Sequence, residues 1–240
     1  QEATRWLDDA WELLEPVRPA EDGWQDAVVV LLFDREGTAS EAWPAVLDLF
    51  VEREQLMASG AEHMKQDPGA LTLRQVPAFI QPTWDMAGDA AAGDDEFRLA
   101  NEVVHKFAQC LVTERFGQVP DTVRWGMGYV VEQRLFRSIY QFDGSGFVSA
   151  SSHHDWPKRT AALLKDHAKD DAFSVASLAA EGRGGQAEPP QMVTWASLDY
   201  LVHEDPEDLA GLLGQLGQLH DGASGWRGTS GYAGSEEGTR

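Results

Sequence analysis

The chain has 240 residues with 40 acidic and 19 basic side chains, which gives a formal net charge of −21. Its length is enough to bury a core in one large domain or two small ones, and 42% hydrophobic residues with nine Trp exclude a wholly disordered chain. The strong negative charge repels phosphate backbones, so we expect no nucleic-acid partner. The longest apolar run, residues 27–33, is too short to cross a bilayer, so we expect no membrane span.

The sequence starts at Gln1, without an initiator Met or a signal peptide. An exported protein trimmed to its mature end has this form, as does a shortened chain. We therefore expect a periplasmic or secreted protein. Its single cysteine, Cys110, excludes an internal disulfide framework and is expected to be a small buried hydrophobic residue.

Residues 1–96 predict a strand-containing N-terminal subdomain. Apolar residues at helical spacing predict a helix over 2–15, and the run AVVVLLF at 27–33 predicts a central strand. A second helix is expected from about residue 40 to 59, ending at Gly60.

The segment 71–80 favours β structure, and an acidic loop follows it at 86–96. Pro77 and Pro82 restrict the segment to an edge strand or an irregular hairpin, because proline cannot donate to a strand ladder.

Residues 97–220 predict an all-helical subdomain, and the Gly/Ser-rich residues 221–240 predict a flexible tail. The helices are expected over 97–116, 122–140, 155–168, 192–203 and 206–219. Asp205 is a candidate N-cap for the last helix. The predicted fold class is α+β, with a small mixed or antiparallel sheet and its edge strand in the N-terminal half, and a helical C-terminal half.

The most informative pattern lies in residues 98–136, where NEVVH (101–105) is followed by a Pro120 loop and WGMGYVVE (125–132). This order resembles the gluzincin, or peptidase MA-like, zinc metallopeptidases. In that family the first helix carries His-Glu-x-x-His and the second carries a ligand Glu followed by Gly. Two His four residues apart share a helix face and bind one Zn²⁺, and the Glu beside the first activates the zinc-bound water.

The resemblance implies a zincin-like fold whose metal ligands are lost. Asn101 stands where the first His is expected and Trp125 where the ligand Glu is expected, with Gly126 matching the Gly after it. His105 is the one ligand that remains, and Glu102 keeps the general-base position. The resemblance therefore implies no catalytic residue, no metal and no cofactor, and a vestigial cleft formed by Asn101, Glu102, His105, Trp125, Tyr129 and Glu132.

Two other interpretations of these residues stay open. A zinc site can draw on ligands from elsewhere, namely His105, His153, His154 and Glu132, with His203–Glu204 as a further candidate. Glu132 lies about 10 Å along the helix axis from Trp125, which argues against a simple exchange of ligand. Alternatively, NEVVH is an ordinary turn of an amphipathic helix, with Glu102 solvated and His105 hydrogen-bonded near the surface.

Trp125 also has two interpretations. It fills the space left by a missing metal, or it forms an aromatic platform with Tyr129 for a peptide or a sugar. Packing is the simpler role for a large apolar side chain.

Three function classes follow from these observations. The first is a non-catalytic pseudo-peptidase that acts as a binding or structural subunit of a larger, exported assembly, with other protein subunits or a peptide as partners. The second is an active zinc-dependent peptidase with a non-standard ligand set. The third is a helical interaction protein unrelated to peptidases.

Overall fold

The computed structural model describes residues 2–19, 28–33, 42–52, 58–66, 71–73, 78–82, 99–139, 155–167 and 188–224. Most of these residues are helical and a few form a small sheet, so the broad α+β class is confirmed. The elements in chain order are α1 (Glu2–Leu14), β1 (Val29–Phe33), α2 (Ala42–Glu52), α3 (Ala58–Gln66), β2 (Leu71–Leu73), β3 (Ala78–Pro82), α4 (Leu99–Phe116), α5 (Asp121–Phe136), α7 (Trp156–His167), α9 (Glu188–Glu204) and α10 (Pro206–Ser224).

The three described strands form a mixed sheet in the order β1–β3–β2. β3 pairs in parallel with β1 and antiparallel with β2. The prediction that β1 is a central strand was wrong, because β1 lies at an edge of this sheet. The segment 71–80 was predicted as an edge strand or an irregular hairpin. β2 is an edge strand and pairs antiparallel with β3, as in a hairpin, but β3 itself is central. Pro82 is tolerated in the central strand because it is the last residue of β3, opposite Phe33, where a missing N–H does not interrupt the ladder.

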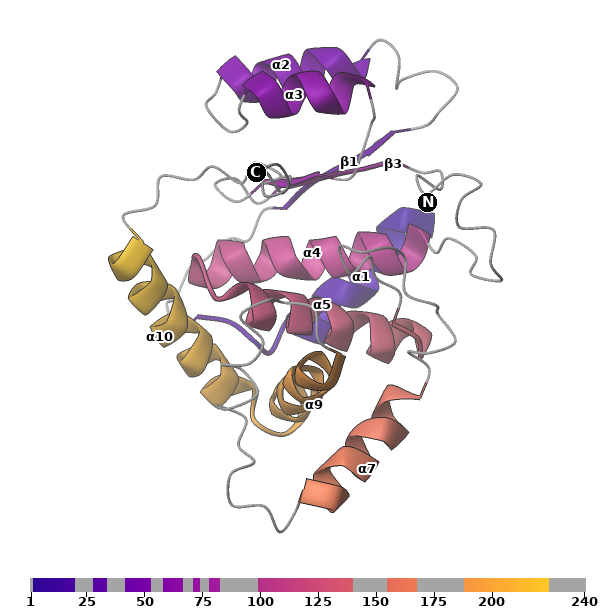
Figure 1. Cartoon of the computed structure of the whole chain (residues 1–240), viewed down its shortest axis with the longest axis vertical. Helices are drawn as coiled ribbons and strands as arrows, with labels where there is room; N and C mark the ends of the chain where they lie inside the picture. Colours follow the sequence, from indigo (N-terminus) through magenta and orange to yellow (C-terminus); the bar gives the residue numbers. More distant parts are fainter. Residues whose placement is uncertain are drawn as a thin grey trace, which may run out of the picture.

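One side of the sheet is covered by α2 and α3 (Figure 1). The prediction of a single helix over 40–59 that ends at Gly60 was wrong, because α2 ends at Glu52 and Gly60 lies inside α3. Packing explains the second helix: Trp43 and Leu47 of α2 and Ala61 of α3 form one buried cluster, with Leu31 of β1 packed against it. Burial of this shared apolar surface outweighs the modest cost of a glycine in a short helix.

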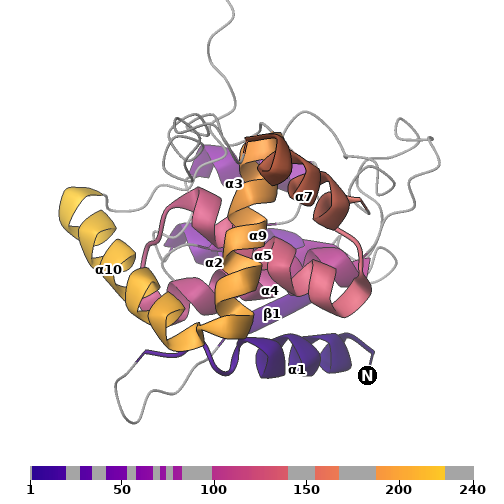
Figure 2. The ribbon, with the colours of Figure 1, turned by 90° about the horizontal axis from the view of Figure 1, so that it is seen from below.

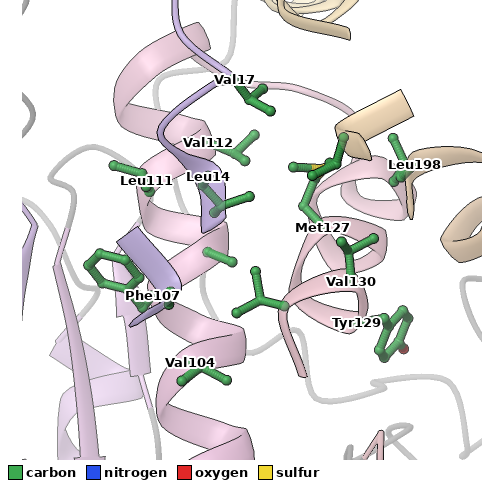
Figure 3. Packing of buried hydrophobic residues seen from close by; sticks show 14 of the residues in the cluster. Leu14, Val17, Val104, Phe107, Leu111, Val112, Met127, Tyr129, Val130 and Leu198 are labelled. Carbon is green, nitrogen blue, oxygen red and sulfur yellow. The ribbon is translucent and has the colours of Figure 1, made fainter. Parts of the chain in front are cut away.

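The other side of the sheet carries the main core, in which α4 and α5 are central (Figures 1 and 2). Figure 3 shows how closely this core is filled, with side chains drawn from α1, α4, α5 and α9. Arg115 of α4 joins α1 to the core because its buried guanidinium donates to the carbonyls of Leu14 and Val17, 2.6 and 2.7 Å away. Leu14 is the last residue of α1 and its carbonyl also accepts the N–H of Val17 at 3.0 Å, so Arg115 holds the turn that follows α1.

The ends of α4 and α5 decide where the chain turns. Gly117 adopts a left-handed φ of 74° directly after α4, as a helix-ending glycine does. α5 ends at Phe136, four residues before the expected end, because Arg137 takes a φ of 57° and its N–H bonds to the Gln133 carbonyl. This turn returns the buried Ser138 to the first turns of α4.

The last two helices are longer than expected. α9 begins at Glu188 with two prolines in its first turn, where proline loses no intrahelical bond. The predicted cap of α10 is confirmed, since the Asp205 carboxylate accepts the N–H of Asp208 at 3.3 Å. α10 continues to Ser224, so the start of the predicted tail is helical, and residues 225–240 lie outside the described residues. In the described part of the chain, no helix has the length and apolar character needed to cross a membrane.

Candidate polar site between α4 and α5

Three polar side chains meet in the interior of the α4–α5 hairpin. A four-residue connection, 117–120, turns α5 back along α4, so the start of α4 faces the end of α5 (Figure 1). Asn101 Nδ2 donates to Glu132 Oε2 at 2.9 Å, and His105 Nδ1 lies 2.7 Å from Glu132 Oε1. Glu132 of α5 therefore reaches two side chains of α4, and its distance from Trp125 along the helix axis gave no indication of this contact.

This group, which we call the Asn–His–Glu cluster (Asn101, His105 and Glu132), is shielded from solvent. The Glu132 side chain is 0% exposed, and the other two residues are also buried. Asn101 Nδ2 donates a second hydrogen bond to the carbonyl oxygen of Ser138, at 3.1 Å. The amide of Asn101 is thus engaged as a donor, and both carboxylate oxygens of Glu132 are used as acceptors.

His105 is neutral in this cluster. Burial lowers its pKa to about 3, although the nearby Glu102 carboxylate opposes the shift. The contact with Glu132 is therefore a hydrogen bond from a neutral imidazole rather than an ion pair. We assign the ring proton to Nδ1, because the other tautomer would leave a buried N–H at Nε2 without an acceptor. Nε2 then carries a bare lone pair and has no hydrogen-bond partner among the described residues.

Two glycines of α5 allow the surrounding helices to approach this closely. A Cβ on Gly128 would lie 2.5 Å from Nδ1 of His105, so a side chain there would displace the imidazole. A Cβ on Gly126 would lie 2.5 Å from Leu198 Cδ1, so this glycine seats α9 instead. The resemblance to the family indicated Gly126 but not Gly128. Two glycines in a Gly-x-Gly pattern inside a predicted helix are a sign of close packing, and this sign could have identified Gly128 from the sequence.

The predicted general base lies beside the cluster and is ion-paired. Glu102 is mostly buried, and its Oε2 accepts from Lys106 Nζ at 2.7 Å. The alternative in which Glu102 is a solvated surface residue was therefore wrong. Lys106 follows Glu102 by four residues, which is about one helix turn, and this spacing favours an ion pair between them.

The aromatic residues of the predicted cleft are packing residues in the structure. Tyr129 is buried, with its ring edge-on to both His105 and Trp156 at centroid distances of 5.2 Å. The prediction of an exposed aromatic platform that includes Tyr129 was therefore wrong. Trp125 is partly buried and packs against the main core, which agrees with the simpler role for this side chain.

The described residues do not fit a three-ligand zinc site. Nε2 of His105 is available, but Glu132 lies on the Nδ1 side of the ring and cannot share an ion with Nε2. Within the described ranges, no group of three or more His, Cys, Asp or Glu side chains is placed to hold a metal. His203 is exposed at the end of α9 with its Nε2 3.8 Å from Glu204, and the candidates His153 and His154 lie outside the described residues.

Cys110 lies in α4 and is buried, as expected. Burial raises the pKa of its thiol to about 12, so the thiol is uncharged at neutral pH and is a poor nucleophile.

Comparisons with known proteins give no relative for this arrangement. Neither the family models, nor the curated proteins, nor the solved structures contain a match to the chain.

Proposed function

We propose that this protein is a non-catalytic binding or structural subunit of a larger assembly, built on the zincin-like helix pair of a gluzincin-type peptidase that has lost its metal ligands. The observation that carries the proposal is the Glu132 carboxylate, which joins Asn101 and His105 across α4 and α5. Two residues at ligand positions, Asn101 and His105, are thereby held as hydrogen-bond donors to Glu132 inside the protein.

The orientation of His105 supports descent from a metal site. A metal-binding histidine usually donates one ring N–H to a carboxylate, which fixes the tautomer and directs the other nitrogen at the ion. His105 has this arrangement, with Nδ1 on Glu132 and a bare Nε2.

The residues at the other two ligand positions support loss of the metal. The amide of Asn101 donates to Glu132 and Ser138, and an amide is a weak ligand for Zn²⁺. Trp125 has no donor atom for a metal. Glu102, at the base position, is ion-paired with Lys106.

An active zinc peptidase is the second candidate, and the observation in its favour is the unpartnered Nε2 of His105. In that case the remaining ligands come from residues such as His153 and His154. Metal analysis of the protein purified without chelators separates the two candidates. About one zinc per chain would overturn the non-catalytic proposal.

The descent itself is tested by restoring the ligands. The double variant Asn101→His with Trp125→Glu supplies the two missing donors, and we expect it to bind zinc at about one equivalent by titration calorimetry. The matched control adds His105→Gln and is expected to bind none. Circular dichroism establishes that both variants are folded. A folded double variant that takes up no zinc would favour the third class, a helical interaction protein unrelated to peptidases.

A further inference from the structure

Among the described residues, α10 is attached to the molecule by one side. Leu209 and Leu213 are buried in the main core. Gly217 crosses the end of α4 so closely that a Cβ would overlap the carbonyl oxygen of Phe116. These contacts fix one side of α10 against α4 and α9, and the helix lies at the margin of the molecule in both views (Figures 1 and 2).

An adjacent side of α10 exposes two large apolar residues. Leu212 is 43% exposed and Leu219 is 70% exposed. They are seven residues apart, so they lie on one helix face, which we call the apolar stripe. Leu216 is seven residues from the buried Leu209 and packs against the main core, so it borders the stripe on its buried side. α10 has 19 residues and is about 28 Å long, and the stripe lies in the middle of this length. Exposed apolar stripes of this kind are typical of a surface that binds another protein.

A small residue beside Leu212 leaves room for a partner. A Cβ on Gly211 would meet no atom within 4 Å, so the backbone of α10 is open there. A second helix can therefore lie close to α10 beside Leu212 without displacing a side chain.

The charge of this region identifies the kind of partner. Residues 188–224 contain seven Asp and Glu residues and no Lys or Arg. Four of these carboxylates are exposed where α9 meets α10, and they are Glu204, Asp205, Glu207 and Asp208. A second copy of the chain, with its own net charge of −21, would be repelled, whereas a cationic partner would be attracted.

We propose that the outer face of α10 (Asp208, Leu212 and Leu219) binds a basic amphipathic helix of a partner protein. The apolar side of that helix covers the leucines, and its Lys or Arg residues face the carboxylates at the start of α10. The inference rests on the binding role proposed above and gives it a surface and a class of partner.

The test uses the full chain and a synthetic 18-residue peptide with Leu at positions i, i+3, i+4 and i+7 and Lys at the others. We expect saturable binding in the micromolar range by fluorescence anisotropy. The same peptide with Glu in place of Lys is expected to bind at least tenfold more weakly. Higher salt should weaken binding of the Lys peptide, because charge attraction is screened.

Two variants locate the binding on the molecule. Leu212→Ser with Leu219→Ser should weaken binding of the Lys peptide by roughly tenfold or more, because about two leucine contacts are lost. The matched control is Leu164→Ser on α7, a leucine that is 44% exposed, and it should leave binding unchanged.

Three results would overturn the inference: no saturable binding of the Lys peptide, equal binding by the double variant, or equal binding of the Glu peptide. Sedimentation of the free protein is the remaining measurement. A dimer that the double variant dissociates would assign the face to a second copy and also overturn the inference. Zinc uptake tests the α4–α5 pair and peptide binding tests α10, so failure of one proposal is distinguishable from failure of the other.

Discussion

The α4–α5 hairpin and the outer face of α10 depart from the usual distribution of side chains in opposite directions. The hairpin buries a carboxylate, an amide and an imidazole in its interior, whereas α10 exposes leucines to solvent. Buried polar groups are tolerated when they are hydrogen-bonded to one another. Exposed apolar residues at helical spacing have no such compensation in the part of the chain that the structure describes.

The difference shows which region can be understood without a partner. In the Asn–His–Glu cluster, Glu132 satisfies two side chains of α4, so its arrangement is explained by contacts within the described structure. On α10, the contacts of Leu209 and Leu213 explain one side of the helix only. The first region is therefore tested by stability measurements, and the second by binding.

Removal of the Glu132 carboxylate should have the largest effect on stability. Glu132→Leu leaves the Nδ1–H of His105 without its acceptor and removes one of the two acceptors of Asn101. A buried neutral donor that loses its acceptor typically costs about 1–3 kcal/mol, and because two donors are affected we expect the free energy of unfolding in urea to fall by about 2–4 kcal/mol.

Glu132→Gln is the matched control, because it keeps the shape of the side chain and one oxygen acceptor. Its cost should be smaller, about 1–2 kcal/mol. Equal stability of Glu132→Leu and the unaltered protein would mean that the cluster does not hold α4 against α5, and the contrast with α10 would then disappear.

The attachment of α10 gives the next largest effect. Gly217→Ala places a methyl group on the backbone carbonyl of Phe116, which cannot rotate away, so we expect a loss of about 1–3 kcal/mol in urea unfolding. Gly214→Ala, one turn away, meets no atom within 4 Å and should instead stabilise the helix by up to about 1 kcal/mol. A loss of stability in Gly217→Ala together with a gain in Gly214→Ala would establish the side by which α10 is attached. Equal changes in stability in the two variants would contradict this attachment.

Much of the helical architecture could be predicted from the sequence, because it depends on local signals. The end of α4 at Phe116 and the Asp205 cap of α10 both lie where expected. The sheet order could not be predicted in the same way. Pro82 argued against a central strand, but its cost depends on whether its position faces a ladder partner, and that is decided by the pairing of β3 with β1.

The candidate site was predicted as a set of residues but not as a geometry. Asn101 and His105 share a face because they are four residues apart, and this is visible in the sequence. The contact with Glu132 depends on the register of α5 against α4, which is set by the short connection and by Gly128. Neither register nor helix crossing can be read from the periodicity of one helix.

The cluster should also make stability depend on pH. The pKa of His105 is about 3 in the folded protein and about 6.5 in an unfolded chain. Below pH 6.5 the unfolded state therefore binds a proton that the folded state does not, and the free energy of unfolding falls as the pH falls, by up to about 1.4 kcal/mol per pH unit. This loss is absent above pH 7.

The measurement compares urea unfolding of the unaltered protein with that of His105→Asn between pH 7.5 and pH 5.0. Other groups, such as the exposed His203, are present in both proteins and cancel in the difference. We expect the unaltered protein to lose about 2 kcal/mol more than the variant over this range. Parallel pH profiles would mean that His105 titrates as an exposed histidine, contrary to its burial in the cluster.

The smallest expected effect on stability is on the outer face of α10. Leu212→Ser with Leu219→Ser should change the free energy of unfolding by no more than about 0.5 kcal/mol, because residues this exposed contribute little to the core. The measurement is urea unfolding, with Leu164→Ser as the matched control. A loss of 2 kcal/mol or more would mean that these leucines pack within the chain, so the face would be part of the core rather than a surface for a partner. A small loss in stability together with weaker peptide binding is the combination that a docking surface requires, since its apolar residues are covered only when the partner is bound.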